Sequence, residues 1–315
     1  MLAISDDFIK ENINCQSLIK SLKAAFKKQE IRCPAKINFD YSSSQTVDNN
    51  KMMLMPAWDN QDYFGIKLIT ATPDNYKTAH AYLNGTYLLF DAKTGMPIAS
   101  MDAKLMTHIR TAATSVLASM ILAKQNARSV MIIGNGNIAA HYIDAYASID
   151  TVDTIYIWGR RYDKSVHISD AYTEDSCHVI ALKEFEETIH LVDIVSCITS
   201  AKSPIILPQH LSKNQHYDLA GSYTTDMIEM YVDAVAQCSI YVDNMEVTPT
   251  HAGELYHAIQ EAKISLADIQ GSLSDICNDE SIDRVSDGIT LFKSTGMGLE
   301  DLVLASMIYE KYIQS

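Results

Sequence analysis

The sequence predicts an α/β fold in which a central Rossmann-type, doubly wound parallel sheet follows an N-terminal α/β domain. Three observations predict it. Between residues 128 and 243, apolar strands alternate with helical stretches, as right-handed βαβ units require. One of these strands runs directly into a glycine-containing turn at 134–139 and then a helix. The segment 51–103 instead holds short strands separated by turn residues, which is typical of an antiparallel sheet.

The elements before residue 128 are predicted in chain order. Residues 5–29 have apolar side chains at helical spacing, with acids early and lysines late, and they predict one or two helices. Residues 105–125 repeat small and apolar side chains at i, i+3 and i+4, which predicts a long helix. The predicted strands between them cover 36–44, 51–58, 64–73, 86–95 and 96–103.

The second half alternates strand and helix. Its last segment, 289–313, is predicted to be a strand, a glycine-containing turn and a helix with acids at its start. The other predicted helices are 137–149 and 182–191, and the other predicted strands are 128–134, 154–159, 194–200, 216–222 and 240–243.

Length and composition narrow the class of protein. With 315 residues the chain is long enough for two domains, and its formal charge of −14 disfavours binding to nucleic acid. We find no apolar stretch near the roughly 18 residues of a membrane span, and no basic, apolar N-terminal leader, so a cytoplasmic protein is expected. The six cysteines and ten histidines are scattered, which predicts neither a disulfide framework nor a metal site.

The turn after the strand at 128–134 reads G-x-G-x-x-A, through Gly134, Gly136 and Ala139. The first glycine permits a tight turn, the second lets a pyrophosphate approach the backbone, and the alanine allows close packing of helix on strand. The start of the helix, with Asn137 and Ile138, would turn its N–H groups toward the phosphates. This predicts a dinucleotide site, although glycines that merely turn a strand into a helix are the alternative.

The next strand is followed by Gly159, Arg160 and Arg161, where an NAD-selective site commonly has Asp or Glu. A guanidinium group can bind a 2′-phosphate through two hydrogen bonds, so the pair favours NADP(H) as cofactor. A solvated loop is the alternative, and NAD(H) stays open.

Seven segments of the chain carry recognisable motifs, in the order GIKLIT, FDAKTGMPIASMDA, LMTHIRTAATS, MIIGNGNIAA, ITSAKSPI, HAGEL and TLFKSTGMGLEDL. Together they are similar to the ornithine cyclodeaminase/mu-crystallin family of NAD(P)-dependent enzymes, over about residues 30–310. The resemblance implies a homodimer, a substrate-binding and dimerisation domain at 1–115 completed by about 296–315, and a dinucleotide-binding domain at 116–295.

The resemblance implies an active-site lysine at Lys67 and a substrate-carboxylate ligand at Arg110, with a cofactor or substrate contact at Thr111. Physically, a lysine in the middle of an apolar strand must meet a carboxylate or titrate with a lowered pKa. A lysine whose charge reaches solvent at the strand edge, and an arginine on the surface of its helix, are the alternatives.

Further roles follow from the same resemblance. Lys36 lies where many relatives have a second carboxylate-binding arginine, although a lysine lacks the planar fork of donors. Thr199 and Ser200 match a loop that contacts the nicotinamide ribose, with capping of a turn as the alternative. Thr295 and Gly296 match a turn that lines the substrate pocket.

One departure from the family pattern bears on the reaction. Cyclodeaminases and alanine dehydrogenases of the family have an aspartate two residues after the glycine that matches Gly221, but this chain has Tyr223 there. Asp226 follows three residues later. Without that carboxylate, oxidation of a charged amine lacks its expected base, whereas reduction of a preformed imine does not need it.

The sequence therefore predicts an enzyme that reduces a cyclic ketimine acid with NAD(P)H, and Tyr223 is expected at its substrate. Δ1-Pyrroline-2-carboxylate, giving L-proline, is the first expected substrate, and Δ1-piperideine-2-carboxylate, giving L-pipecolate, is the second. The alternatives are an ornithine cyclodeaminase, an alanine- or opine-type dehydrogenase, and a carrier protein that binds the cofactor without chemistry.

Overall fold

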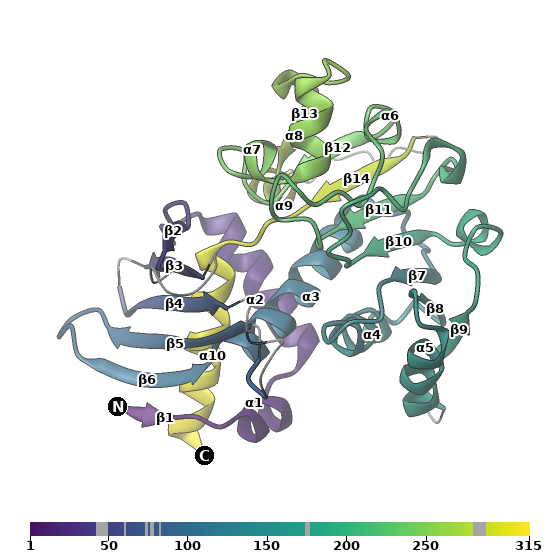
Figure 1. The fold of residues 1–315 in the computed structure, drawn as a ribbon. Coiled ribbons are helices and arrows are strands. Elements are labelled where there is room, and N and C mark those ends of the chain that lie inside the picture. The colour runs from purple at the N-terminus through teal and green to yellow at the C-terminus, as the bar shows by residue number, and fades with distance from the viewer. Residues whose placement is uncertain are drawn as a thin grey trace. The chain divides into compact units, whose positions relative to one another are not determined.

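A computed structural model describes residues 1–41, 50–59, 61–72, 75, 79–81, 83–173, 177–279 and 288–315. The chain forms two compact units, one of Met1–Thr111 with Met297–Ser315 and one of Ala112–Gly296. The predicted domains divide at nearly the same points, and the roles assigned to them stay predictions. The predicted α/β class is confirmed, because one unit contains a mixed sheet with helices and the other a parallel sheet with helices (Figure 1).

The first unit contains a sheet of six described strands in the order β1-β6-β5-β4-β3-β2. The strands β2 to β6 pair antiparallel, as predicted, and β1 pairs parallel with β6. No strand was predicted at β1, because two residues are too few to form a pattern. The strands are β1 (Leu2–Ala3), β2 (Ile37–Asp40), β3 (Lys51–Trp58), β4 (Tyr63–Ala71), β5 (Leu83–Asp91) and β6 (Pro97–Asp102).

Helices α1 (Asp6–Asn12) and α2 (Cys15–Lys28) confirm the predicted N-terminal helices, and each begins at a side-chain cap. Helix α10 (Gly298–Gln314) returns from the C-terminal end of the chain and packs on β3, β4, β5 and α2 (Figure 1). Its first residue approaches the sheet closely, since a Cβ on Gly298 would lie 2.8 Å from the carbonyl oxygen of Pro56. The first turn of α10 is therefore held against β3.

The second unit contains a sheet of eight described strands, all parallel, in the order β13-β12-β14-β11-β10-β7-β8-β9. Its central strands β10, β11 and β14 are buried along their whole length, as parallel strands with both faces covered are. The strands are β7 (Ser129–Ile133), β8 (Thr154–Trp158), β9 (His178–Leu182), β10 (Ile194–Cys197), β11 (His216–Leu219), β12 (Ser239–Val242), β13 (Ile269–Ser272) and β14 (Thr290–Lys293).

Most helices of the second unit are short. The predicted helix at 137–149 is confirmed as α4, whereas α5 to α9 and the strands β9 and β13 were not predicted. The α-helices are α4 (Ala139–Ala147), α5 (Tyr162–Ser169), α6 (Val232–Val235), α7 (Thr248–His251), α8 (Gly253–Gln260) and α9 (Leu273–Asn278), and the 3-10 helices are η2 (Asp170–Tyr172), η3 (Thr188–Leu191), η4 (Pro208–His210) and η5 (Leu266–Asp268).

The predicted helix at 182–191 is wrong. Leu182 ends β9, and the segment contains only the short helix η3. Phe185 and Ile189 suggested a helix because they are four residues apart, and both are indeed buried. One turn, closed by a 2.8 Å hydrogen bond from the Ile189 amide to the Phe185 carbonyl, is enough to bury them.

Helix α3 (Ala103–Leu122) confirms the predicted long helix and corrects one expectation. It has 20 residues and a mean hydropathy of 1.2, so by length and composition alone it could cross a membrane, contrary to our finding from the sequence. Of the 18-residue apolar stretch within this helix, 67% is buried inside the protein. This burial is typical of a core helix.

Candidate functional site

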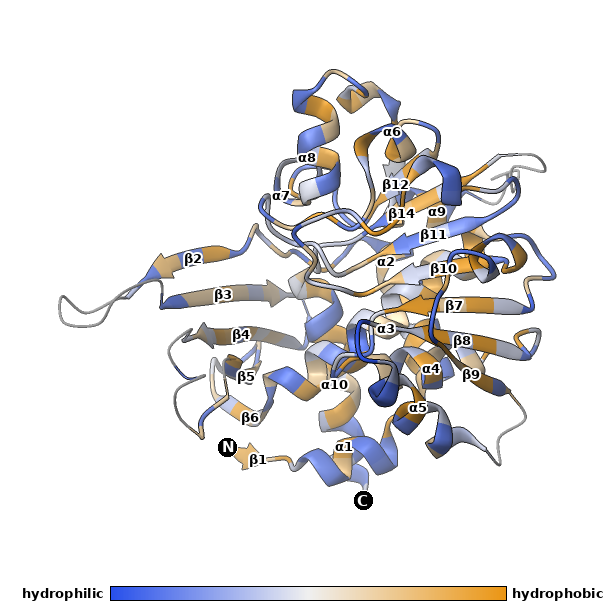
Figure 2. Cartoon of the chain, turned by 45° about the vertical axis from the view of Figure 1, so that its right-hand side comes forward, coloured by the Kyte–Doolittle hydropathy of each residue, from blue (hydrophilic) through white to orange (hydrophobic). Residues whose placement is uncertain are grey.

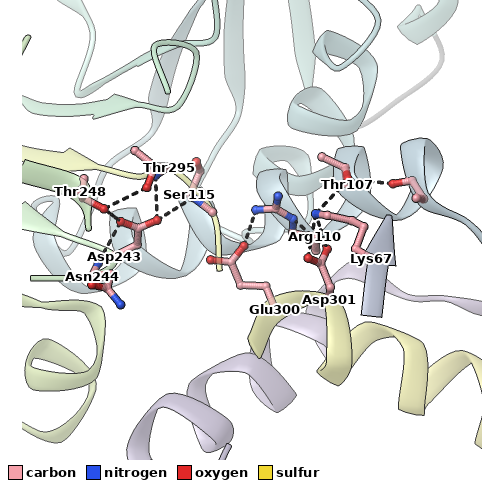
Figure 3. A network of polar contacts seen from close by, with 12 residues as sticks. Lys67, Thr107, Arg110, Ser115, Asp243, Asn244, Thr248, Thr295, Glu300 and Asp301 are labelled. Atoms are coloured by element: carbon pink, nitrogen blue, oxygen red, sulfur yellow. Dashed lines mark hydrogen bonds and ion pairs between the residues drawn. The ribbon is translucent and has the colours of Figure 1, made fainter. Parts of the chain in front are cut away.

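Lys67 lies in the middle of β4, with a side chain only 1% exposed. Its Nζ is 2.9 Å from Oδ1 and 2.7 Å from Oδ2 of Asp301, and 3.3 Å from Oγ1 of Thr107 (Figure 3). Burial and the nearby Arg110 guanidinium lower the pKa of Lys67 to about 8, although Asp301 opposes them. Both physical expectations for this lysine are therefore met, and it is not at the strand edge.

Arg110 is also buried, at 6% exposure, on the part of α3 that belongs to the first unit. Its Nη1 forms an ion pair with Glu300, and its Nε lies 3.3 Å from Oδ1 of Asp301 (Figure 3). The guanidinium group is thus not on the helix surface. Two cations and two carboxylates thus form one cluster, here called the ion-pair cluster. Its members are Lys67, Arg110, Glu300 and Asp301.

Sequence reasoning did not predict the two carboxylates of the ion-pair cluster. Glu300 and Asp301 were seen only as acids at the start of a helix, where they favour the helix dipole. The available signal was the pair of cations, because two buried cations require counter-charges that must come from another segment. Only the packing of α10 on the sheet reveals which acids supply them.

Two other residues predicted in the first unit are half-buried. Lys36 is half-buried and directly precedes the edge strand β2. Thr111 follows Arg110 on α3 and is half-buried. Their contacts with substrate or cofactor stay predictions.

In the second unit, the predicted phosphate turn is a tight turn between β7 and α4, and its binding of a dinucleotide stays a prediction. Gly134 has φ +128°, and its N–H bonds the carbonyl of Trp158 at 2.8 Å. A Cβ on Gly136 would meet no protein atom within 4 Å, so the space that a pyrophosphate needs is open. Ala139 is fully buried at the start of α4, after the exposed Asn137 and the half-buried Ile138.

The loop after β8 is joined to this turn. The side-chain amide of Asn135 donates to the carbonyl of Arg161 at 2.8 Å and to the hydroxyl of Ser165 at 2.9 Å. Gly159 makes this approach possible, because a Cβ there would lie 2.3 Å from the Asn135 side chain. Arg160 and Arg161 are both exposed at the start of α5, where a ligand could reach them.

Glu229 connects the loops that follow β10 and β11. Its carboxylate accepts hydrogen bonds from the amides of Thr199, Gly221 and Ser222, at 2.7, 2.8 and 3.0 Å. Gly221 must be glycine, because a Cβ would lie 1.9 Å from the carbonyl of Thr199. Thr199 is half-buried and Ser200 exposed in the first of these loops. Sequence reasoning missed Glu229, which lies in an irregular segment.

A second buried lysine lies beside Glu229. Lys293 at the end of β14 is 2.9 Å from Oε1 of Glu254, 3.7 Å from Oε2 of Glu229 and 3.0 Å from the hydroxyl of Ser222. The two carboxylates hold the pKa of Lys293 above its usual value although burial opposes them. Burial raises the pKa of Glu229 to about 7, against the effect of Lys293.

The turn at Thr295 and Gly296 is held by Asp243, which follows β12. Oδ2 of Asp243 accepts from both backbone amides, each at 2.7 Å, and Thr248 bonds Thr295 at 3.0 Å (Figure 3). The two amides and the Thr248 hydroxyl all donate to the Asp243 carboxylate, and together they fix the shape of this turn. Its place at the substrate stays a prediction.

Tyr223 is half-buried. The nearby Asp226 does not take the place of the family aspartate that Tyr223 replaces. Asp226 is exposed and forms a 2.8 Å ion pair with Lys202. Among the described residues, no group of three His, Cys, Asp or Glu side chains is placed to hold a metal ion. His251 and His257 instead contact the backbone carbonyls of Val247 and Thr225.

The chain is similar to known proteins both in sequence and in fold. The sequence profile described as the ornithine cyclodeaminase/mu-crystallin family matches residues 2–315. The Delta(1)-pyrroline-2-carboxylate reductase of Colwellia psychrerythraea is 31% identical over an alignment of 320 positions that covers 99% of each chain.

Solved structures agree with the fold. The Thermococcus litoralis Delta(1)-pyrroline-2-carboxylate reductase, in complex with NADH and L-proline, superimposes with a TM-score of 0.91 at 23% identity, covering 100% of this chain and 98% of that one. An archaeal alanine dehydrogenase dimer with bound NAD gives 0.89 at 21%, covering 100% and 96%. At these identities the structures establish a shared fold.

Proposed function

Because the chain belongs to the ornithine cyclodeaminase/mu-crystallin family, we propose that it reduces a cyclic ketimine acid with a nicotinamide cofactor. Δ1-Pyrroline-2-carboxylate, giving L-proline, is the first substrate, and Δ1-piperideine-2-carboxylate, giving L-pipecolate, is the second. The observation that carries the proposal is the buried pair of Lys67 and Arg110, which offers a proton donor and a carboxylate ligand together. The name of the Colwellia relative supports the same substrate.

The residues of the chain have distinct roles in this reaction. Arg110, with Lys36, binds the substrate carboxylate, so that orientation supplies part of the rate. Lys67 gives a proton to the imine nitrogen and stabilises the charge that develops there. The bound cofactor supplies the hydride that the imine carbon takes up. One hydride and one proton convert the C=N bond to CH–NH, and Lys67 regains its proton from water.

Deamination is less compatible with the second unit. Tyr223 replaces the family aspartate, and Asp226 is already paired with Lys202 on the surface. Imine reduction needs no base to remove a proton from an ammonium group, so it tolerates this replacement. We therefore place Tyr223 and the turn at Thr295 and Gly296 at the substrate ring as shape-determining groups.

The cofactor is held by the phosphate turn and by the loops that Glu229 connects, with Thr111, Thr199 and Ser200 as further contacts. We propose a preference for NADPH over NADH, because Arg160 and Arg161 are exposed where a 2′-phosphate could reach them. Replacement of both arginines by alanine should raise the KM for NADPH at least tenfold and leave the KM for NADH nearly unchanged. An equal change in both KM values would contradict this preference.

The decisive assay follows NADPH and NADH oxidation with each cyclic imine, and with pyruvate plus ammonia. A parallel reaction tests L-ornithine for ammonia release. Rapid oxidation with a cyclic imine supports the proposal and ranks ring size and cofactor together. Ammonia from ornithine, without net change of cofactor, would establish a cyclodeaminase instead, and oxidation only with pyruvate and ammonia would indicate an alanine-type dehydrogenase.

A further inference from the structure

The first turn of α10 supplies both carboxylates of the ion-pair cluster. Asp301 contacts Nζ of Lys67 with both carboxylate oxygens, at 2.9 and 2.7 Å, while Glu300 pairs with Arg110. Both carboxylates are fully buried. Neither acid is therefore a surface charge that merely favours the helix dipole.

We propose that Asp301 is a positioning residue for Lys67, which it orients through two oxygens and keeps in the ammonium form. This inference rests on the proposed function, in which Lys67 gives a proton to the imine nitrogen. A neutral lysine has no proton to give in that step, so the reaction depends on a counter-charge inside the protein. Asp301 is the carboxylate in direct contact with Nζ.

The surroundings of Lys67 explain why such a partner is needed. Arg110 and Thr107 face it from α3, Glu300 and Asp301 from α10, and Tyr87 is its register partner on β5. Burial and the positive charge of Arg110 both disfavour the ammonium form. Asp301 offsets them, which leaves the pKa of Lys67 at about 8, so the group is protonated at neutral pH.

The packing of α10 determines that Asp301 reaches Lys67. Gly298 lies three residues before it, and a Cβ there would be 2.8 Å from the carbonyl of Pro56 and 3.2 Å from Cβ of Ala57. A side chain at this position would push the first turn of α10 away from β3. The glycine thus permits the close contact that brings Asp301 to the neighbouring strand β4.

Asp301→Asn tests the inference, because asparagine has nearly the same shape without the charge. The loss of a neighbouring opposite charge should lower the pKa of Lys67 by roughly 1–3 units. As the pH rises, turnover of the variant should therefore decline at a lower pH than turnover of the wild type. The variant should keep more of its activity at pH 6 than at pH 8. Asp301→Glu restores the charge and should recover most of the shift.

The Lys67 titration also gives a readout without turnover. In protein labelled with 13C-lysine, the Lys67 signal is the one lost in Lys67→Met, and it should titrate at lower pH in Asp301→Asn. Asp62→Asn is the matched control, since it removes an exposed aspartate 3.2 Å from Lys93 in the same unit. Its profile and its Lys67 signal should match the wild type.

Two outcomes separate this inference from the proposed function. An unchanged Lys67 titration in Asp301→Asn, with thermal unfolding that shows a folded protein, would overturn the role of Asp301. A wild type that reduces no cyclic imine would overturn the proposed reaction, while the NMR titration would still decide whether Asp301 holds the proton on Lys67. If Asp301→Asn does not fold, Asp301→Ser, which also removes the charge, takes its place, and an unchanged Lys67 titration in that folded variant would overturn the role of Asp301.

Discussion

At the scale of single residues, burial decides which charged groups can do chemistry. Lys67 is 1% exposed and has a lowered pKa, whereas Lys93 in the same unit is on the surface and paired with Asp62. A proton donor needs a pKa near the working pH, which a lysine attains only when its charge is partly disfavoured. The difference between the two lysines arises from their surroundings and not from residue type.

Lys67→Met should reduce turnover about 100-fold or more, because general acid catalysis typically contributes at least that much. The dissociation constant of NADPH should stay near its wild-type value, since the phosphate turn belongs to the other unit. Steady-state rates and fluorescence titration of the cofactor check the two expectations. Turnover like that of the wild type would remove Lys67 from the mechanism.

Asp218 in β11 predicts a pH-dependent stability. It is fully buried, and although Ser196 donates a hydrogen bond to it at 2.5 Å, burial raises its pKa to about 6 from an unfolded value of 3.8. The neutral acid therefore favours the folded state fully below pH 3.8, and this contribution is lost as the pH rises through 6. The difference is about 3 kcal/mol.

Asp218→Asn stays neutral at every pH, so it should remove that part of the dependence. Urea unfolding at pH 4, 5, 6 and 7 measures the free energy of unfolding of both proteins. The wild type should lose about 2 kcal/mol more than the variant between the ends of this range, because part of the 3 kcal/mol is already lost at pH 4. Parallel curves would mean that Asp218 does not titrate there.

At the scale of elements, the parallel sheet gathers the predicted cofactor residues at the carboxyl ends of its strands. The phosphate turn follows β7, Arg160 and Arg161 follow β8, and the loops held by Glu229 follow β10 and β11. This edge is where open α/β sheets bind ligands. Figure 2 shows β7 as mostly hydrophobic and β11 as hydrophilic, although both strands are buried.

The two glycines of the phosphate turn should respond differently to substitution. A side chain at Gly136 meets no protein atom within 4 Å, so Gly136→Val should keep the melting temperature within a few degrees. It should raise the dissociation constant of the dinucleotide at least tenfold, because the side chain occupies the pyrophosphate position.

Gly134→Ala is the matched substitution. It should lower stability by roughly 1–3 kcal/mol, because φ is +128° and the new Cβ would lie 2.9 Å from the Ile198 side chain. Thermal unfolding and cofactor titration of both variants test the contrast. Loss of stability in Gly136→Val with intact cofactor binding would show that the turn serves only the fold.

At the scale of the whole molecule, the first unit exposes an apolar edge. Ile37, Phe39 and Tyr41 lie in or next to β2, with Trp58 on β3, and each is more than a third exposed. An unpaired edge strand with apolar side chains invites contact with another chain. We expect the homodimer that the family resemblance implies to use this edge.

The dimer prediction is checked by mass in solution. Sedimentation should give twice the 35.1 kDa of one chain. Phe39→Glu, which puts a charge on the apolar edge, should shift the mass toward that of the monomer, whereas Leu191→Glu, at an exposed position in the second unit, should not. A monomeric wild type would reject the expectation.

Local sequence patterns were enough to predict the class of fold and the turns that depend on short segments. Strand and helix periodicity is local, so the antiparallel region, the helix α3 and the glycine turn at Gly134 were predictable from short windows. The single turn at Phe185 was mistaken for a helix, because one turn buries residues four apart just as a longer helix does.

Which charged side chains meet depends on packing between distant parts of the chain. Asp301 is 234 residues from Lys67 in the chain, and Glu229 connects loops that begin at two different strands. No local pattern indicates such partners, because the counter-charge of a buried group is chosen by packing over long separations. The apolar strand around Lys67 predicted that this lysine would be paired or have a lowered pKa, but its partner Asp301 is brought to it by the close approach of α10 at Gly298.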